Sequence, residues 1–407
     1  MQCRHCGTPL SVQFADLGSA PPSNAYLTAA SLQKPESWLP LRVLACTQCW
    51  LVQTEDYAGA DQIFTDDYAY FSSYSKTWLD HSENYVISMI DRFHLDASSR
   101  VVELAANDGY LLQFVAARGI PCLGIEPTAS TATAARAKGL EILQEFFGVP
   151  LAKRMRSRGQ DATVVTANNV LAHVPDINDF LSGVSILLQR DGVATFEFPH
   201  LLNLINYNQF DTIYHEHYSY LSLIALQQIF KRNGLSVFDV EELPTHGGSL
   251  RVYADRLEHP RPPTRAVERL LDREQSAGLH TERMYAGFQW RIERAKNDFL
   301  RFLLEAKASN KQVAAYGAAA KGNTLLNYAG VRPDLIPYVV DKNPSKQGKF
   351  LPGSRIPIVS EERIRSERPE YVLILPWNIR SEVEQDLEYI RNWNGQFVTA
   401  IPEMLIQ

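Results

Sequence analysis

Residues 101–109 read VVELAANDG, and residues 110–114 continue as YLLQF. The apolar run Val101-Val102-Glu103-Leu104 predicts a strand, and the apolar run that begins at Tyr110 predicts a helix. Gly109 stands between them, where a tight turn needs a residue that tolerates unusual backbone angles. A strand, a turn and a helix form the repeating unit of a doubly wound α/β fold.

Similar units lie on both sides of this stretch. We expect further strands at residues 41–44, 122–125, 162–165, 193–196, 250–253, 312–316, 338–341 and 371–375. Residues 264–308 contain no Pro and are rich in Arg, Glu, Leu and Ala, which predicts one or two long helices. The sequence therefore predicts an α/β protein in three parts: a small module in residues 1–66, a central Rossmann-like domain in residues 67–260, and a helical linker with a second, smaller Rossmann-like domain in residues 261–407.

The bulk composition is that of an ordinary globular protein. The chain has 407 residues, 45% of them hydrophobic and 21% charged, and a formal net charge of −6. This charge gives no electrostatic reason to bind nucleic acid. We find no signal peptide and no apolar run long enough to span a membrane, so we expect a cytoplasmic protein.

Four of the five cysteines form two Cys-x-x-Cys pairs, Cys3 with Cys6 and Cys46 with Cys49. In a reducing compartment such pairs are metal ligands more often than disulfides, and four thiolates suit tetrahedral zinc. An iron–sulfur or redox role and unmetalated cysteines are the alternatives. A closed four-sulfur site leaves no position for substrate, so we expect a structural zinc. Residues 7–45 between the pairs must carry a small sheet or loop.

Three segments resemble the cofactor site of class I S-adenosylmethionine methyltransferases. The first is the loop at the end of the first strand, with Glu103, Ala105, Asn107, Asp108 and Gly109 as candidate cofactor residues. The second is Gly-Ile-Glu-Pro, in which Glu126 is placed to accept the ribose hydroxyls. The third contains Asn168 and Asn169 at the end of a later strand. A dinucleotide-binding Rossmann unit is the alternative, but the Gly-x-Gly-x-x-Gly triplet is missing. Ala105 departs from the usual glycine.

The stretch FDTIYHEHYSY, residues 210–220, is too polar to be explained by packing. It combines imidazoles, carboxylates and phenols. Proton abstraction next to a carbonyl needs a base that titrates near neutrality and groups that stabilise an oxyanion. The stretch is therefore a candidate catalytic segment.

Taken in order, the motifs resemble one family along the whole chain. They are the two Cys-x-x-Cys pairs, ELAANDG, GIEP, NNVLAHV, YHEHYSY, HGGSLRVY, YGAAAKGNTLLNY and VDKNPSKQGKFLPG. Together they are similar to the bacterial nucleotide-sugar C-methyltransferases, which methylate a ring carbon of dTDP-linked 4-keto deoxysugars. The resemblance implies S-adenosyl-L-methionine as cofactor, a zinc-binding N-terminal domain, and a C-terminal domain that helps to hold the sugar nucleotide.

The resemblance also implies catalytic residues. The last histidine of YHEH, His217, is the expected general base, with Tyr214 and Glu216 beside the sugar and His173 at the cofactor rim. The alternative is that His215 is the base and His217 only positions the substrate.

Other polar positions are candidates for binding the substrate. The expected contacts are Tyr68, Tyr70, His215, His246, Gly247, Gly248, Ser249, Arg251, Lys321, Asn323, Asp341 and Lys342. Tyr68 and Tyr70 belong to a candidate lid, for which a solvated linker is the alternative. Lys321 would meet a phosphate at a helix N-terminus.

The function expected from this reading is S-adenosylmethionine-dependent methylation of a dTDP-4-keto deoxysugar by a monomer that binds neither nucleic acid nor membrane. Carbons C3 and C5 are both acidic beside a C4 ketone, and we favour C3. The alternatives are a zinc-knuckle nucleic-acid methyltransferase and a family member that binds sugar nucleotide without turnover.

Overall fold

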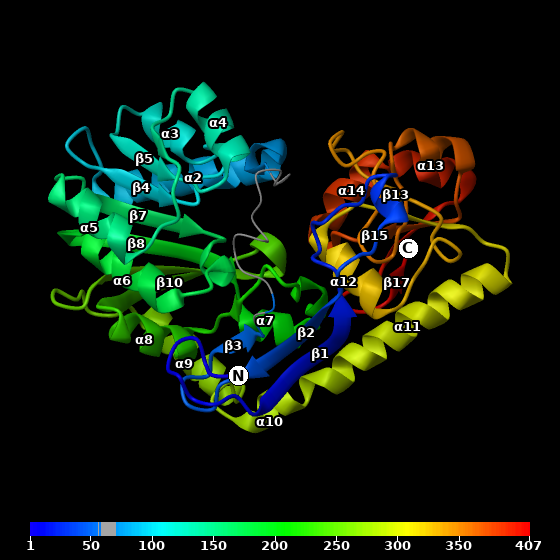
Figure 1. The fold of residues 1–407 in the computed structure, drawn as a ribbon, viewed down its shortest axis with the longest axis horizontal. Helices are drawn as coiled ribbons and strands as arrows, with labels where there is room; N and C mark the ends of the chain where they lie inside the picture. The colour runs from blue at the N-terminus through cyan, green and yellow to red at the C-terminus, as the bar shows by residue number, and fades with distance from the viewer. Residues whose placement is uncertain (56, 58–70) are drawn as a thin grey trace.

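The computed structural model describes residues 1–55, 57 and 71–407. Tyr68 and Tyr70, the expected lid residues, lie outside the described residues. Two lobes stand side by side, with strands β1 and β2 and helix α11 below and between them (Figure 1). No helix in the described part of the chain is long and apolar enough to cross a membrane.

The central lobe contains a seven-stranded sheet in the order β10-β11-β8-β7-β4-β5-β6. Its strands are β4 (Val101–Leu104), β5 (Cys122–Ile125), β6 (Ile142–Leu143), β7 (Ala162–Asn168), β8 (Leu188–Pro199), β10 (Leu235–Leu243) and β11 (Ser249–Arg256). β11 is antiparallel to both of its neighbours, whereas β4 to β8 pair in parallel. The prediction of a doubly wound α/β domain is confirmed, and β4 and β5 have the predicted bounds.

Helices cover both faces of this sheet and enclose two apolar cores. They are α2 (Lys76–Phe93), α3 (Leu112–Ala116), α4 (Ala129–Ala137), α5 (Val149–Ser157), α6 (Ile177–Leu187), α7 (Leu201–Asn206) and α8 (Leu223–Arg232). Capping marks several starts: the Ser75 hydroxyl accepts the Trp78 N–H, and the Asp176 carboxylate accepts the N–H groups of Asn178 and Asp179.

A four-stranded antiparallel sheet joins the N-terminal module to the central part of the chain. It contains β1 (Val12–Ala20), β2 (Leu39–Ala45), β3 (Val52–Thr54) and β9 (Ser219–Tyr220) in that order. β9 belongs to the polar stretch singled out in the sequence, so the candidate catalytic segment completes the sheet of the cysteine-rich module. The expected small sheet between the two cysteine pairs is present as β1 and β2.

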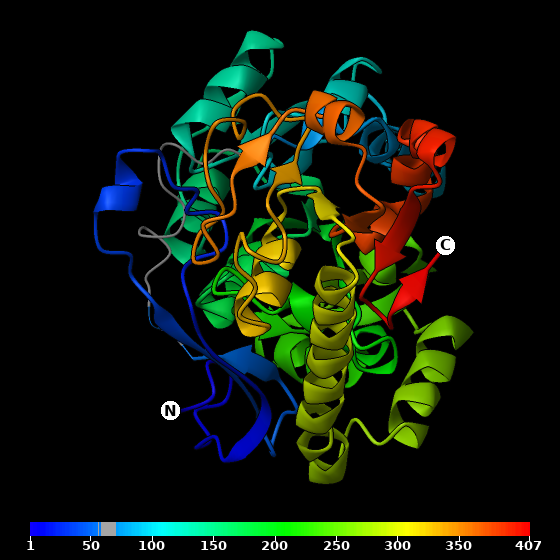
Figure 2. The same ribbon diagram turned by 90° about the vertical axis from the view of Figure 1, so that its right-hand side faces the viewer.

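The prediction for residues 264–308 is wrong in detail, because this region forms three helices. They are α9 (Arg265–Ser276), α10 (Glu282–Ala286) and α11 (Phe288–Ala308). Gly278 has a φ of +86°, which ends α9, and Gly287 separates α10 from α11. Figure 2 faces the C-terminal lobe and shows α11 extending from it toward the N-terminal strands.

The C-terminal lobe is the expected smaller α/β unit. Its sheet has the order β14-β13-β12-β15-β16-β17, and the first five of these strands are parallel. The strands are β12 (Val313–Tyr316), β13 (Val339–Val340), β14 (Ile358–Val359), β15 (Tyr371–Ile374), β16 (Gln396–Thr399) and β17 (Leu405–Ile406). The helices are α12 (Ala320–Tyr328), α13 (Glu362–Glu367) and α14 (Arg380–Asp386). Short 3₁₀ turns include η1 (Ser31–Gln33), η2 (Ser72–Tyr74), η3 (Leu171–His173), η4 (Phe210–Thr212), η5 (Thr245–Gly247), η6 (Trp377–Ile379) and η7 (Glu388–Trp393).

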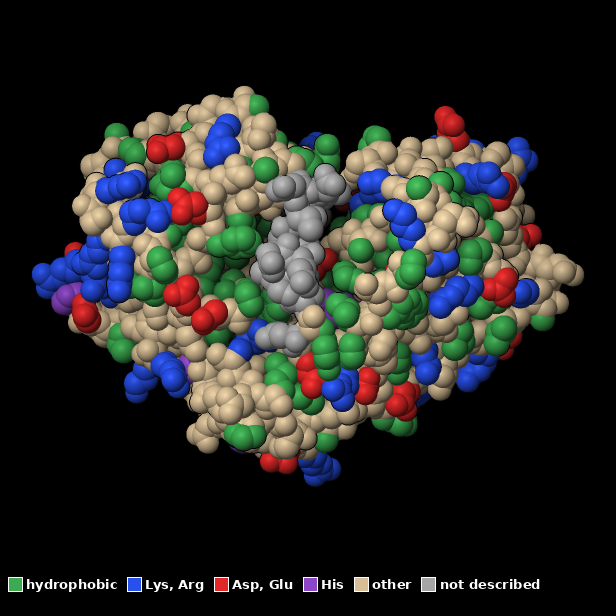
Figure 3. All heavy atoms as spheres, viewed as in Figure 1, with side chains coloured by type: hydrophobic (Ala, Val, Ile, Leu, Met, Phe, Trp, Pro, Cys, Tyr) green, Lys and Arg blue, Asp and Glu red, His purple; other side chains and the backbone are tan. Residues whose placement is uncertain are grey.

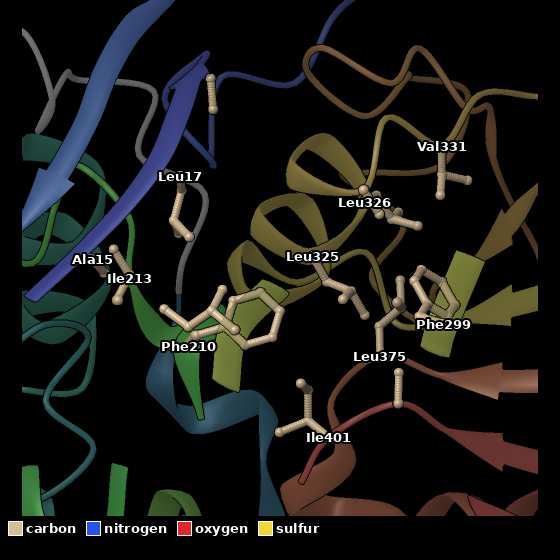
Figure 4. Close-up of a cluster of buried hydrophobic side chains, with 14 of the residues drawn as sticks. Ala15, Leu17, Phe210, Ile213, Phe299, Leu325, Leu326, Val331, Leu375 and Ile401 are labelled. Carbon is tan, nitrogen blue, oxygen red and sulfur yellow. The ribbon is translucent and has the colours of Figure 1, made fainter. Parts of the chain in front are cut away.

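One apolar cluster crosses all three parts of the chain. Figure 4 shows Ala15 and Leu17 of β1 beside Phe210 and Ile213 of the polar stretch, with Leu325 of α12 next to Phe210 and Leu326 farther along, toward Val331. Phe210 and Ile213 are fully buried. Because burial of such side chains contributes about 1.5–3 kcal/mol each, the cluster holds the polar stretch against both the N-terminal module and the C-terminal lobe.

Candidate active site

The candidate cofactor loop lies at the carboxyl ends of β4, β5 and β7, where ligands bind in open α/β sheets. The surface is indented on this side, between the central and C-terminal lobes (Figure 3). Within the loop, Ala105 has a φ of +53°, Asn107 a φ of +49° and Gly109 a φ of +76°. Ala105 therefore adopts the left-handed conformation that glycine accepts without strain.

Glu126 ties this loop to the next strand. Its carboxylate accepts the backbone N–H of Asn107 at 2.9 Å and that of Thr128 at 2.9 Å. Each carboxylate oxygen has a further lone pair, so Glu126 can hold the loop and still accept from a ribose hydroxyl. The Asn107 side chain in turn accepts the N–H of Ser72 at 3.0 Å.

Several buried oxygens around the loop lack a hydrogen bond of good geometry within the described residues. They are both carboxylate oxygens of Glu103, Oδ1 of Asp108 and Oδ1 of Asn169. Burial raises the pKa of Glu103 well above its usual range, although the Tyr110 phenol opposes the rise. The Asp108 and Asn169 oxygens are acceptors, as are those of Glu103 when it is ionised, and S-adenosylmethionine offers amino and hydroxyl donors and a positive charge. The residues present therefore fit this cofactor.

Asn168 and Asn169 end β7 on the same side of the sheet. Asn168 is buried, and its Oδ1 accepts the Thr166 hydroxyl at 3.4 Å. Asn169 has a φ of +55°, and its Nδ2 lies 3.2 Å from Nε2 of His246. The structure thus brings the end of β7 together with the HGGS turn, which are far apart in the sequence.

His217 is buried and held in one tautomer. Its Nδ1 lies 2.7 Å from the carbonyl oxygen of Thr212. A carbonyl only accepts, so Nδ1 carries the proton and Nε2 keeps its lone pair. Burial lowers the pKa of His217 well below its usual value, and the neighbouring His173 lowers it further. His217 is therefore a neutral imidazole at physiological pH.

Two of the other predicted catalytic residues pack against His217, and the backbone of the third lies beside them. The His173 ring centroid lies 4.7 Å from that of His217 and the Tyr214 ring centroid 3.9 Å from it. Nδ1 of His173 donates to the Glu216 carbonyl at 2.9 Å, and burial lowers the pKa of His173 to about 4. Burial raises the pKa of the Glu216 carboxyl to about 7.

His215 points away from this cluster and toward the N-terminal module. Its Nε2 lies 3.3 Å and 3.2 Å from the carbonyl oxygens of Leu39 and Pro40. The Thr54 hydroxyl of β3 donates to the His217 carbonyl at 3.0 Å. The two histidines of the YHEH run are thus used differently, since His215 attaches the segment to β2.

The HGGS turn is packed closely against other parts of the chain. A Cβ atom at Gly247 would lie 2.3 Å from the Trp377 ring, and one at Gly248 would lie 2.3 Å from Nδ2 of Asn203. Both glycines also have positive φ, so packing within the protein explains them. The Ser249 hydroxyl is buried and donates to the Thr245 carbonyl at 2.9 Å.

Arg251 is engaged by two carboxylates. It lies 3.0 Å from Glu197 and 3.1 Å from Glu241, and His81 lies 3.0 Å from Glu197. Burial acts to raise the pKa of Glu197, but His81 and Arg251 together hold it below its usual value. His81 and Glu197 were not among the residues expected from the sequence. A charged residue within the apolar strand around Phe196 was the available signal for Glu197.

The candidate residues of the C-terminal lobe divide into two groups. Lys321, at the start of α12, donates to Oδ1 of Asn378 at 2.9 Å, and Asn323 donates to the Ser23 carbonyl at 2.6 Å. Asp341 accepts the Ala318 N–H at 2.8 Å. Lys342 lies apart from these residues, in an exposed ion pair with Asp386.

A second feature missed by the sequence analysis lies between the lobes. The Trp377 indole N–H donates to Oδ2 of Asp211 at 2.7 Å, and the Lys321 ammonium lies 4.6 Å from the Trp377 ring centroid. Burial raises the pKa of Asp211 to about 6, although the Lys321 charge and the Trp377 hydrogen bond oppose the rise. Nothing in the sequence links residues 211 and 377.

The cysteine quartet is arranged for one metal ion. The four sulfur atoms of Cys3, Cys6, Cys46 and Cys49 lie within 4.8 Å of one another. The Cys3–Cys49 and Cys6–Cys46 sulfur distances are both 3.5 Å. Tetrahedral zinc with Zn–S bonds of 2.3 Å needs sulfurs about 3.8 Å apart, so the quartet fits a closed zinc site.

Comparison with known proteins matches three successive parts of the chain to three domain families. Residues 3–64 match a zinc-binding domain family, residues 78–240 a methyltransferase domain family and residues 244–402 the C-methyltransferase C-terminal domain family. The C-methyltransferase NovU of Streptomyces niveus is 35% identical over 403 residues, which cover 99% of this chain and 96% of NovU.

Solved structures with a likeness to the chain are more distant. Magnesium protoporphyrin IX methyltransferase ChlM from Synechocystis PCC 6803, with bound S-adenosylmethionine, is 16% identical with a TM-score of 0.34 and covers 44% of this chain and 79% of its own. An S-adenosylmethionine-dependent methyltransferase from Anabaena variabilis is 14% identical with a TM-score of 0.36, over 46% of this chain and 93% of its own.

Proposed function

Because the chain belongs to the S-adenosylmethionine-dependent C-methyltransferases with an N-terminal zinc-binding domain, we propose that it methylates a ring carbon of a dTDP-linked 4-keto deoxysugar. We favour C3 as the acceptor over C5. The observation that carries the proposal is the neutral imidazole of His217, buried in one tautomer beside His173 and Tyr214.

In this proposal His217 is the general base. A carbon next to a ketone becomes a nucleophile only after it loses a proton. Nε2 of His217 takes that proton, and the electron pair of the C–H bond passes into the enolate. The Thr212 carbonyl, through Nδ1–H, orients the ring and stabilises the imidazolium that forms.

Tyr214, Glu216 and His173 complete the proposed catalytic group. The Tyr214 phenol donates a hydrogen bond to the enolate oxygen as charge develops there. The Glu216 carboxylate accepts from a sugar hydroxyl. His173 packs against His217 and, as a neutral ring, keeps the site free of a positive charge that would weaken the base.

The cofactor residues are proposed from the ends of the parallel strands. Glu126 would accept from the ribose hydroxyls, and Glu103, Asp108 and Asn169 would accept from the cofactor's remaining donors. S-adenosylmethionine, when bound, supplies the electrophilic methyl group. The chain's own contribution is to hold the acceptor carbon in line with that methyl group.

The C-terminal lobe is proposed to hold the nucleotide part of the substrate. Lys321 at the α12 N-terminus supplies positive charge for a diphosphate, and Asn323 and Asp341 lie near the same loop. His246 and Arg251 would contact the sugar from the central lobe.

The direct test is incubation with S-adenosylmethionine and a panel of dTDP-4-keto deoxysugars that differ at C2, C3 and C5. We expect one product heavier by a methyl group, and carbon NMR would show the new methyl on C3. A His217→Ala protein is the control for non-enzymatic transfer. Transfer to C5, or to no sugar in the panel, would contradict the proposal.

A further inference from the structure

The N-terminal module reaches the candidate active site through Asn24. This residue lies in the segment between β1 and β2, at a distance in sequence of 192 residues from Glu216. Its amide nitrogen lies 2.8 Å from each carboxylate oxygen of Glu216. The Glu216 side chain is buried, and Asn24 supplies the hydrogen bonds recorded for its carboxylate within the described residues.

The segment that carries Asn24 is itself held firmly. The Asn323 amide donates to the Ser23 carbonyl at 2.6 Å, and the Tyr26 phenol donates to the Ala318 carbonyl at 2.6 Å. Two backbone hydrogen bonds of 2.9 Å and 2.8 Å join Leu27 to Phe350. The C-terminal lobe thus fixes the position from which the Asn24 amide meets Glu216.

We propose that Asn24 is a positioning residue that holds the Glu216 carboxylate in one orientation within the site, so that the zinc-binding module takes part in the reaction as well as in stability. The inference rests on the proposed function only in giving Glu216 a role toward the sugar. The contact between Asn24 and Glu216 is independent of it.

Electrostatics indicate what this contact does. Burial raises the pKa of Glu216 to about 7, and the Asn24 hydrogen bond opposes that rise. The titratable side chain that interacts electrostatically with the Glu216 carboxylate is Tyr26, which is neutral at pH 7 because burial raises the pKa of its phenol. His173 meets the backbone carbonyl of Glu216 and not its carboxylate, and burial lowers the pKa of that ring to about 4. Within the part of the chain that the structure describes, Glu216 forms no ion pair, so its carboxylate depends on the Asn24 amide to remain ionised near neutral pH.

The test compares Asn24→Leu, which keeps the size and removes the donor, with Ser31→Ala, a half-buried position of the same segment outside the site. The protein is labelled with ¹³C at glutamate carboxyl carbons, and the Glu216 signal is assigned from its absence in Glu216→Gln. In Asn24→Leu we expect the titration midpoint of Glu216 to rise by at least about one pH unit, which lowers the ratio of ionised to protonated carboxyl about tenfold and the ionised fraction at pH 7 about fivefold. In Ser31→Ala the midpoint should not move.

The pH profile of kcat provides the second readout. If the ionised carboxylate is the working form, Asn24→Leu loses about fivefold in kcat at pH 7 and recovers toward the wild-type rate at pH 9. A loss that is equal at every pH, with an unchanged Glu216 midpoint, would overturn the proposal. If Asn24→Leu does not fold, Asn24→Asp decides instead: two facing carboxyls share one proton, so the midpoint of the pair must rise.

The two proposals fail in different ways. If the wild type transfers no methyl group to any sugar, the proposed function fails while the NMR titration still tests Asn24. If the wild type is active and the titration midpoint of Glu216 does not change in Asn24→Leu, only the proposed role of Asn24 fails.

Discussion

Nδ1 of His217 donates a 2.7 Å hydrogen bond to the carbonyl oxygen of Thr212, five residues earlier in the same segment. The bond fixes which ring nitrogen is protonated. It leaves the lone pair on Nε2, in a ring that packs against His173 and Tyr214. A local turn therefore decides the protonation state and the orientation of the candidate base.

The first prediction concerns this base. His217→Ala should lower kcat by about 10²–10⁴-fold, the usual range for a positioned general base, while both ligands still bind. Solvent deuterium exchange at the acidic carbon, measured by NMR without the methyl donor, should also stop. His215→Ala is the matched control: it should lower stability, because it frees the Leu39 and Pro40 carbonyls, but should retain exchange. The opposite pattern would place the base at His215.

The second prediction concerns the metal. Elemental analysis should find one zinc per chain, and Cys46→Ser should abolish it and lower the melting temperature. The loss of stability in Cys46→Ser should extend beyond the metal site to β9, because Gln53 donates to the Cys3 sulfur at 3.2 Å and pairs with Ser219 of β9. Cys122→Ser, which changes the cysteine outside the quartet, should keep its zinc. A wild-type protein without zinc would refute this interpretation.

The third prediction concerns the strained loop. Ala105 at φ +53° bears a cost of about 1–2 kcal/mol that glycine avoids. Glycine also makes the unfolded chain more flexible, which offsets about 0.4–1 kcal/mol. Ala105→Gly should therefore raise the free energy of unfolding by up to about 1 kcal/mol in denaturant titrations. Ala106→Gly, at the next and fully buried position without positive φ, should lower it. Equal losses in both variants would mean that Ala105 is not strained.

The fourth prediction concerns the contact between the lobes. The folded-state pKa of Asp211 is about 6, above the unfolded value of 3.8, so its contribution to stability is full below about pH 4 and is lost as the pH rises through 6. Two pKa units correspond to about 3 kcal/mol. Asp211→Asn keeps an acceptor for the Trp377 indole and removes this dependence.

Denaturant titrations at pH 5 and pH 8 would measure the effect. Asp211→Asn should gain stability over the wild type at pH 8, by up to about 3 kcal/mol, and the gain should shrink at pH 5. Trp377→Phe, which removes the donor, should be less stable than the wild type at both values. A pH-independent difference for Asp211→Asn would show that the carboxyl does not titrate in this range.

Local pattern was sufficient for much of the fold. The runs at 101–104 and 122–125 formed strands with the predicted bounds, because alternation of short apolar runs with helical patterns is a property of neighbouring residues. The metal site can also be predicted from local sequence, because each Cys-x-x-Cys pair brings two sulfurs together within one turn of the chain. The helices of residues 264–308 were less well predicted, because two glycines divide a region whose composition favours helix throughout.

The sequence by itself determined which parts the protein contains: an α/β architecture, a group of four cysteines and a polar segment at 210–220, for which we propose a role in proton transfer. Only the tertiary structure decided how those parts are used. It directed His217 toward the candidate site and His215 toward Leu39. It also brought Asn24 into contact with Glu216, and Trp377 into contact with Asp211. The two residues in each contact that joins different parts of the chain are at least 166 positions apart in the sequence. Contacts of that kind arise from the packing of whole units around one shared apolar cluster, and no local periodicity records them.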